Sequence, residues 1–525
     1  MTPFALLVVF GSACGLCLLL TPIVRAAALR WGLVDEPDGR RKIHPHPIPV
    51  AGGVAVLLTA AVVLAGTLVL VEPLAQRFAD RWLTFTGLAA AAAVIAVVGV
   101  ADDYRGLRGR HKLLGQLVAV AIVIACGVKV QSIRLFGTDF SLGYWAVPFT
   151  VAWLLGAINS LNLIDGMDGL LGSLGGIMCA ALAAMAFMNQ HVEVAVIAAA
   201  MAGSLIGFLC FNFPPATIFL GDCGSMLIGL VVGVLAIEGS LKGAATVALA
   251  APAALLILPI LDTSAAIVRR TLTGRSIYAT DRGHLHHVLL LHGLSNRGVL
   301  LLVAGLCTVA GVGALLSLYR NNELYALVSV VVVVGVLVLF RLFGYAEFLL
   351  LKERLLSVVF AVRHGHEHDR VYQSAVRLQG SADWNDLWRH VTVCAAELRL
   401  RAVCLDVNAP ALHEGYHARW GRVPGGDEAA GFWRAEVPLA VRGQIVGRLV
   451  VDGPHDGGAV RDALAAVAKV VEDVEMALAG LTAPPAASTL EEVPNDPAGP
   501  DDTGPPTTPQ AAPPPRSAPQ PAARP

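Results

Sequence analysis

The most constraining feature of this sequence is a series of long apolar runs, nearly free of charge, that continues to about residue 343. Each run is roughly 17 to 25 residues long, the length that an α-helix needs to cross a bilayer. The composition agrees, because 56% of the residues are hydrophobic and only 15% are charged. We therefore expect an all-α polytopic membrane protein with about eleven transmembrane helices. The expected spans are 4–24, 51–72, 83–100, 113–130, 144–162, 170–188, 193–211, 224–240, 245–268, 298–318 and 324–343.

Charge in the loops predicts the orientation. The loops 27–50, 101–112 and 269–297 carry thirteen lysines and arginines, whereas the alternate loops carry six. The positive-inside rule makes the first set cytoplasmic, and an odd number of spans puts the C-terminus in the cytoplasm. The run 4–24 is too long for a signal peptide's apolar region and lacks a basic start, so we expect it to be a retained first span. We expect a multi-pass protein of the inner (cytoplasmic) membrane.

The composition changes after the last span and predicts four regions. Residues 1–343 form the membrane domain, and 344–367 form an amphipathic surface helix and linker. Residues 368–482 have the composition of a small soluble α/β domain, whereas 483–525 are rich in Pro and Ala and predict a disordered tail. Strands are expected at 403–407, 432–441 and 444–452, turn or bulge points at Gly443 and Gly447, and a closing helix at 459–481.

Two classes of function are disfavoured by composition. A formal net charge of −1 argues against a nucleic-acid partner, which would require a basic surface. The only CxxC pair, Cys14 and Cys17, lies inside the first apolar run and has no second pair to complete a zinc site.

Three acidic motifs stand at the ends of apolar runs, and all fall on the predicted cytoplasmic face. They are Asp102-Asp103, the segment 159–168 and the segment 219–225. An ionised carboxylate near hydrocarbon costs several kcal/mol unless it is paired, hydrated or metal-bound, so such residues are functional candidates. Their convergence on one face predicts a divalent cation that handles phosphates.

Adjacent carboxylates at a helix end point about 100° apart, so only one of Asp102 and Asp103 can face a given ligand. One of them can serve as base or metal ligand while Arg105 or Lys112 binds the other. The alternative, a salt-bridged loop start, is about equally compatible with this pair alone.

Asn159, Asn162, Asp165 and Asp168 follow one another at intervals of three. On a helix they would form one polar stripe that runs off the membrane end, where Gly166 and Gly169 let a ligand approach or break the helix. Asn and Asp oxygens suit a hard cation such as Mg²⁺. The alternative is a polar seam between helices.

In Phe219-Leu-Gly-Asp222-Cys-Gly-Ser225 a carboxylate lies between glycines just before a span. Glycine-rich turns and helix N-termini attract phosphate. Phe219 could stack on a base, although an ordinary buried aromatic is equally compatible.

Basic and imidazole groups complete the set on the cytoplasmic side. The run Asp281-Arg282-Gly-His284-Leu-His286-His287 offers donors to phosphate, with zinc binding as the alternative. The first loop adds Lys42 and His44 before a Gly52-Gly53 pair, and its alternative is a loop that only sets topology.

Together these motifs resemble, in order, those of the polyprenyl-phosphate N-acetylhexosamine-1-phosphate transferases (glycosyltransferase family 4). The likeness covers about residues 1–343, and the His-Leu-His-His form is similar to the branch that acts on UDP-N-acetylglucosamine. The resemblance implies Mg²⁺-dependent transfer of a sugar 1-phosphate, GlcNAc-1-phosphate being favoured, from a UDP-sugar to undecaprenyl phosphate with release of UMP. This reaction starts a lipid-linked cell-envelope glycan such as an O-antigen or a teichoic acid. Mn²⁺ is expected to substitute for Mg²⁺.

The resemblance also implies roles for single residues. Asp222 and Asn162 would bind the metal, and Asp102, supported by Asp103, would deprotonate the lipid phosphate. Phe219 would stack on uracil. The other substrate-binding residues are Lys42, His44, Asn159, Asp165, Gly166, Met167, Asp168, Arg282, His284, His286 and His287. A direct displacement is preferred over a covalent phospho-aspartate route, which stays open.

The segment 433–451 is similar to the core hairpin of GAF-type sensory domains, with a generic α/β module as the alternative, so a regulatory ligand or protein partner is expected there. The oligomeric state stays open, with a homodimer among the alternatives. Three alternative interpretations stay open: an ion-coupled polytopic transporter, a membrane receptor, and the peptidoglycan branch that transfers phospho-N-acetylmuramoyl-pentapeptide. Asp262 lies inside a predicted span and has no assigned role.

Overall fold

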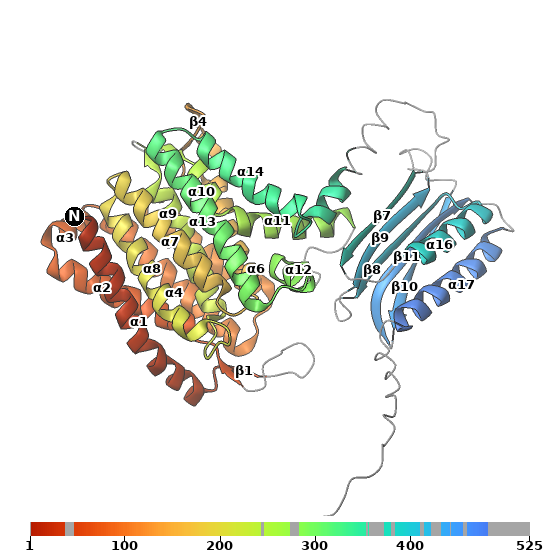
Figure 1. Cartoon of the computed structure of the whole chain (residues 1–525), viewed down its shortest axis with the longest axis horizontal. Helices are drawn as coiled ribbons and strands as arrows, with labels where there is room; N and C mark the ends of the chain where they lie inside the picture. Colours follow the sequence, from red (N-terminus) through yellow and green to blue (C-terminus); the bar gives the residue numbers. More distant parts are fainter. Residues whose placement is uncertain are drawn as a thin grey trace, which may run out of the picture. The chain divides into compact units, whose positions relative to one another are not determined.

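The computed structural model describes residues 2–36, 47–242, 246–273, 283–352, 355, 372–379, 384–409, 414–421, 432–441, 443–454 and 459–480. The N-terminal part is a bundle of long helices, and the C-terminal part is an antiparallel sheet with helices packed on it (Figure 1). Three predicted site residues, Lys42, His44 and Arg282, lie outside the described residues.

The bundle contains long helices joined by short helices and strands. Its helices are α1 Pro3–Trp31, α2 Gly52–Leu70, α3 Glu72–Asp80, α4 Trp82–Arg105, α5 Gly109–Ala125, η1 Gly143–Trp145, α6 Ala146–Ile164, α7 Leu170–Met188, α8 Val192–Asn212, α9 Gly221–Gly239, α10 Ala250–Leu255, α11 Ile257–Leu272, α12 Leu285–Leu291, α13 Asn296–Arg320 and α14 Leu324–Leu339. Its strands are β1 Val34–Asp35, β2 Ile48–Pro49, β3 Ser132–Leu135, β4 Thr138–Ser141, β5 Leu241–Lys242 and β6 Thr246–Ala248.

Within the described residues, eight helices are long and apolar enough to cross a membrane. They coincide with eight of the predicted spans and confirm an all-α polytopic membrane protein. The other three predicted spans, 113–130, 245–268 and 324–343, fall on shorter helices: α5 has 17 residues, α14 has 16, and the pair α10 and α11 has 6 and 16.

The span predicted without interruption at 245–268 is wrong in detail. Its first residues form β6, α10 ends at Leu255, and α11 begins at Ile257. Pro259 explains the break, because a proline has no N–H to donate to the carbonyl four residues earlier, and its ring collides with that carbonyl. The affected carbonyl belongs to Leu255, where α10 ends.

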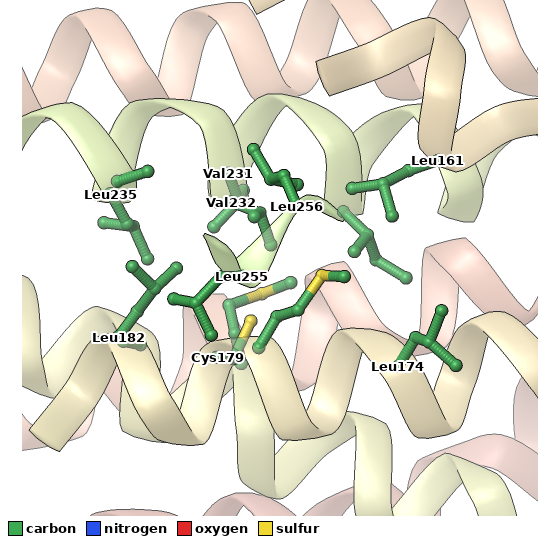
Figure 2. Close-up of a cluster of buried hydrophobic side chains, with 14 of the residues drawn as sticks. Leu161, Leu174, Cys179, Leu182, Val231, Val232, Leu235, Leu255 and Leu256 are labelled. Atoms are coloured by element: carbon green, nitrogen blue, oxygen red, sulfur yellow. The ribbon is translucent and has the colours of Figure 1, made fainter. Parts of the chain in front are cut away.

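The core of the bundle is formed by apolar side chains from α6, α7, α9 and α10. Figure 2 shows Leu161, Leu174, Val231 and Leu255 from these four helices closing on one another, and each is at most 5% exposed. In a bilayer such side chains stabilise the bundle through van der Waals packing, because lipid chains are as apolar as leucine. This packing fixes α6 against α9, whose polar ends carry the candidate site.

The C-terminal part is a five-stranded antiparallel sheet of order β10-β11-β8-β9-β7. Its elements are β7 Tyr372–Gln379, α16 Asn385–Glu397, β8 Ala402–Ala409, β9 Glu414–Gly421, β10 Phe432–Val441, β11 Gln444–Pro454 and α17 Ala459–Gly480. The three predicted strands and the closing helix are confirmed. Gly443 adopts a φ of +78° in the turn between β10 and β11, and the register shift in that pair falls between Leu439, which pairs with Gly447, and Ala440. The sequence did not predict β7, β9 or α16.

Candidate active site

Two carboxylates from different helices meet on one lysine. Asp102 lies at the C-terminal end of α4 and Asp222 in the first turn of α9. The Lys112 ammonium, from α5, lies 3.0 Å from Asp102 Oδ2 and 2.6 Å from Asp222 Oδ1. The sequence offered Lys112 as a partner for one carboxylate of the Asp102-Asp103 pair, and the structure places it on Asp102. The Lys112 ammonium therefore places one positive charge between the two carboxylates.

Asp103 makes different contacts from its neighbour. Its Oδ1 accepts from the backbone N–H of Asp222 at 2.8 Å, and its Oδ2 accepts from that of Cys223 at 3.2 Å. Asp103 thus supplies from α4 the cap that the first turn of α9 does not obtain from its own N-cap side chain. The division of labour follows from the angle of about 100° between adjacent helical positions.

Gly99 explains how α4 comes close enough to α9 for these contacts. A Cβ on Gly99 would lie 2.3 Å from Cys223 Cα, so the two backbones touch at this point. Gly99 precedes Asp102 by about one helical turn, so Asp102 and Asp103 emerge beside the first turn of α9.

Asn162, near the end of α6, connects to the same carboxylate. Its Nδ2 donates to Asp222 Oδ1 at 2.5 Å and to Ser225 Oγ at 2.7 Å. The site therefore draws on four helices: α4, α5, α6 and α9. Ser225 was quoted in a sequence motif but not predicted as a site residue, although a serine three positions after Asp222 on a helix shares its face.

The predicted polar stripe is only partly helical. The helix α6 ends at Ile164, so Asn159 and Asn162 lie on the helix whereas Asp165 and Asp168 lie in the loop that follows. Asn159 is directed at Gln116 of α5: its Nδ2 donates to Gln116 Oε1 at 2.8 Å, and Gln116 Nε2 donates back at 3.3 Å. This exchange is the seam between helices that was the alternative for the stripe.

The loop after α6 is braced against the loop before α9. Asp168 Oδ2 accepts from the Ala216 N–H at 2.9 Å. Asn212 is 5% exposed; its Oδ1 accepts from the Gly169 N–H and its Nδ2 donates to the Ile218 carbonyl, both at 3.0 Å. Asn212 was not predicted as a site residue, and its only signal in the sequence is a polar residue at the end of an apolar run.

The surroundings of Asp165, in the same loop, shift the pKa of its carboxyl. Burial, followed by the negative charges of Asp222, Asp103 and Asp168, raises the pKa of the Asp165 carboxyl to about 8. In the metal-free protein this carboxyl is therefore mostly protonated at neutral pH.

Phe219 lies beside the end of the loop between α1 and α2. Its N–H donates to the Pro49 carbonyl at 2.8 Å, and its carbonyl accepts from the Gly52 N–H at 2.9 Å. These backbone bonds attach the Gly52-Gly53 end of that loop to the segment before Asp222. The Phe219 side chain is half-buried.

The histidine turn, defined here as residues 283–287, reaches the loop after α6. His284 Nδ1 lies 3.0 Å from Asp262 Oδ2. His286 is 2% exposed, and a Cβ on Gly166 would lie 2.2 Å from its Nε2, so the imidazole packs directly on the Gly166 backbone. The ring of His287 lies 4.2 Å from that of His286, measured between centroids.

His286 is an uncharged group in this arrangement. Neither of its ring nitrogens has a hydrogen-bond partner among the described residues. Burial, together with the neighbouring His287 and His284, lowers the pKa of His286 to about 3. A buried imidazole without partners, next to Gly166, is available to hydrogen-bond a ligand.

The donor set suits a hard cation without forming a complete cage. Within the described part of the chain, no three His, Cys, Asp or Glu side chains are grouped so that they could bind a metal ion. The groups that do converge, Asp102, Asp222 and Asn162, offer carboxylate and amide oxygens, which Mg²⁺ prefers. Mg²⁺ also keeps several waters and takes phosphate oxygens as ligands, so a partial protein donor set fits it.

Comparison with known proteins agrees with this site. Residues 85–240, which include Asp102, Lys112, Asn162 and Asp222, match glycosyl transferase family 4. A probable undecaprenyl-phosphate N-acetylglucosaminyl 1-phosphate transferase of Bacillus subtilis is 32% identical over 288 residues, or 54% of this chain and 77% of that protein. The chain belongs to glycosyl transferase family 4.

Other relatives represent two branches of this family. A decaprenyl-phosphate N-acetylglucosaminephosphotransferase of Mycobacterium tuberculosis is 34% identical over 349 residues, covering 61% of this chain and 84% of that protein. A phospho-N-acetylmuramoyl-pentapeptide-transferase of Desulforudis audaxviator is 30% identical over 348 residues, covering 58% of this chain and 99% of that protein. The family resemblance is thus confirmed, whereas the likeness of the C-terminal domain to GAF domains stays a prediction.

Proposed function

We propose that this chain transfers N-acetylglucosamine 1-phosphate from UDP-N-acetylglucosamine to undecaprenyl phosphate at the cytoplasmic face of the membrane. UMP is released, and the product starts a lipid-linked cell-envelope glycan. The observation that carries the proposal is the meeting of Asp102, Asn162 and Asp222 around Lys112 at the ends of four helices. The names of the relatives from Bacillus subtilis and Mycobacterium tuberculosis support the choice of sugar.

The reaction joins two anionic phosphates, so the residues must first bring together groups that repel each other. Lys112 supplies one positive charge between Asp102 and Asp222. A divalent cation bound through Asn162 and Asp222, Mg²⁺ or Mn²⁺ in its place, would neutralise charge on the transferred phosphoryl group. Approximation and charge neutralisation account for most of the catalysis expected in phosphoryl transfer.

In the transfer step an oxygen of the lipid phosphate attacks the phosphorus attached to the sugar. A new P–O bond forms as the bond to the UMP oxygen breaks, and UMP leaves with the bonding electron pair. Asp102 is the candidate base for the lipid phosphate, because its Oδ2 faces the Lys112 ammonium, for which a substrate phosphate would compete. Asp103 keeps Asp102 in place through its bonds to the first turn of α9.

The remaining residues divide between the two ends of the nucleotide sugar. Asp165, Gly166, Met167 and Phe219 are proposed to line the uridine pocket. His284, His286 and His287, together with Arg282, Lys42 and His44 outside the described residues, are proposed to contact the pyrophosphate or the sugar. Asp168 is proposed to act indirectly, through its hydrogen bond to Ala216 in the loop before α9. Asn159 is proposed to act through its hydrogen bonds with Gln116.

A panel of UDP-sugars, including UDP-N-acetylmuramoyl-pentapeptide, tests the proposal with undecaprenyl phosphate and Mg²⁺. We expect turnover with UDP-N-acetylglucosamine and exchange of labelled UMP into that substrate, which neither a transporter nor a receptor would catalyse. Asp222→Ala should lower kcat by at least about a hundredfold, in line with the loss of a ligand at a charged transition state. The matched control is Asp139→Ala, at an exposed aspartate in β4. Failure of exchange with every UDP-sugar would refute the activity, and turnover with the pentapeptide alone would move the chain to the peptidoglycan branch.

A further inference from the structure

Helix α11 carries two buried charged residues that the proposed reaction does not use. Asp262 is 0% exposed and Arg269 is 2% exposed. They lie about two helical turns apart and so share one face of the helix. Burial of a charge is costly unless it is paired, so the partners of these two groups indicate what the face is for.

Asp262 binds the start of α12. Its Oδ1 accepts from the Leu285 N–H at 2.7 Å, and its Oδ2 faces His284 Nδ1 at 3.0 Å. The first bond caps the first turn of α12 from another helix. The second fixes the His284 ring, because a carboxylate next to Nδ1 keeps the proton on that nitrogen.

Arg269 binds the residue just before these two. A Cβ on Gly283 would lie 2.4 Å from the Arg269 guanidinium carbon, so the guanidinium rests against the backbone of the histidine turn. Arg269 also forms a buried ion pair with Glu347, which is 7% exposed. Glu347 belongs to the helical segment 345–352, which follows the last predicted span and precedes the C-terminal domain.

These contacts form a continuous chain from Glu347 through Arg269 to the histidine turn, with Asp262 at its far end. We propose that Asp262 and Arg269 are positioning residues for His284 and His286, and that Glu347 sets the position of Arg269. The segment that leads into the C-terminal domain is thereby connected to the candidate site through one buried ion pair. A change in that segment that loosens the pair releases the histidine turn. The effect on catalysis rests on the proposed function, whereas the mechanical connection does not.

Hydrogen exchange of the full-length protein in lipid nanodiscs tests the connection without any substrate. Glu347→Gln removes the charge but keeps the shape, and we expect exchange in residues 283–292 to become at least about tenfold faster while the other helices are unchanged. Glu347→Asp, which keeps the carboxylate, should give an intermediate rate. The matched control is Glu72→Gln, at an exposed glutamate in α3, and it should change nothing in residues 283–292. Unchanged exchange in residues 283–292 of Glu347→Gln, or faster exchange throughout the bundle, would overturn the proposal.

Kinetics give the second readout. If the histidine turn contacts the nucleotide sugar, Glu347→Gln and Asp262→Asn should each raise KM for that substrate by about tenfold and leave KM for undecaprenyl phosphate unchanged. An equal change for both substrates would contradict a positioning role. Complete inactivity of the wild type toward every UDP-sugar would refute the proposed function and leave the exchange result standing, so the two failures are distinguishable.

Discussion

At the scale of single residues, the candidate site is organised by which oxygen faces which donor. Asp222 Oδ1 takes both the Lys112 ammonium and the Asn162 amide, and Asp103 uses both of its oxygens on backbone N–H groups. Asp102 divides its oxygens between the Leu107 N–H and Lys112. Each carboxyl therefore has a distinct set of partners although all three belong to the same type of residue.

Lys112→Met tests the shared lysine. Without the ammonium, Asp102 and Asp222 repel each other and the phosphates meet two uncompensated charges, so we expect kcat/KM to fall by at least about a hundredfold. Lys112→Arg should retain part of the activity because the charge is kept. The control is Lys129→Met, remote from the site in sequence, which should keep wild-type activity. Wild-type kcat/KM in Lys112→Met would show that the pairing with Asp102 and Asp222 is irrelevant to turnover.

Asp165 predicts a coupling between cation binding and pH. Because its pKa is raised to about 8, the metal-free protein carries this proton at neutral pH, and a bound divalent cation displaces it. The apparent affinity for Mg²⁺ should rise by up to about tenfold per pH unit as pH increases toward 8, and then level off. Calorimetric titration at several pH values measures this slope, and Asp165→Asn should flatten it. An identical slope in Asp165→Asn would assign the proton to another group.

The raised pKa of Asp165 also makes the stability of the metal-free protein depend on pH. The unfolded carboxyl has a pKa of about 4, so between about pH 4 and pH 8 the folded state binds more protons than the unfolded state. Asp165 therefore lowers the free energy of unfolding of the metal-free protein as pH rises through that window.

At the scale of secondary-structure elements, close approach of helices decides the geometry. The backbones of α4 and α9 touch at Gly99 and Cys223, and this contact places the end of α4 beside the first turn of α9. The histidine turn depends on α11 in the same way, through Asp262 and Arg269. The candidate site is thus formed by the ends of several helices. The positions of its side chains depend on contacts that these helices make about one turn further into the bundle.

Gly99→Ala tests the contact between α4 and α9. The added methyl group would force the helices apart, since backbone atoms cannot move aside as a side chain can, at a cost of about 1 to 3 kcal/mol. We expect kcat to fall by at least about tenfold and the Tm to drop. Gly66→Ala is the matched control, because a Cβ at Gly66 on α2 meets nothing within 4 Å. Equal activity and Tm in both variants would show that α4 and α9 tolerate a wider spacing.

At the scale of the whole molecule, an odd number of spans would put the ends of the chain on opposite sides of the membrane. Successive long helices cross the bundle in alternate directions. One side of the bundle therefore holds the C-terminal ends of α1, α4 and α6 and the N-terminal ends of α9 and α13. The carboxylates, the amides and the histidine turn are all at that side, which the loop charges predict to be cytoplasmic. The proposed reaction with a nucleotide sugar depends on this orientation.

Cysteine labelling in intact cells tests the orientation. In a background with the exposed Cys210 replaced by Ser, an impermeant maleimide should label Asn322→Cys, in the loop between α13 and α14. Met476→Cys, at an exposed position of α17, should react only after the cells are permeabilised. Labelling of Met476→Cys in intact cells would place the C-terminal domain outside and refute the predicted orientation.

Much of the fold followed from local pattern. Run length and low charge determined most spans, and alternation of apolar residues determined β8, β10 and β11. Three features were not readable in this way. Pro259 interrupts a run that looks continuous by hydropathy, β7 and β9 lack a strong period, and the end of α6 at Ile164 depends on loop contacts made by Asp168 and Asn212.

The sequence by itself determined that this chain is a membrane protein and that carboxylates, amides and imidazoles gather at the ends of its spans, and it predicts that these ends face the cytoplasm. Composition and periodicity are sufficient for this because hydrocarbon excludes charge wherever it occurs. Only the tertiary structure decided that Lys112 joins Asp102 to Asp222, which lies 110 positions after the lysine, that Asp103 caps α9, and that Asp262 and Arg269 support the histidine turn. A hydrogen bond depends on atoms a few ångströms apart, and helix packing alone sets such distances between residues so far apart in the chain.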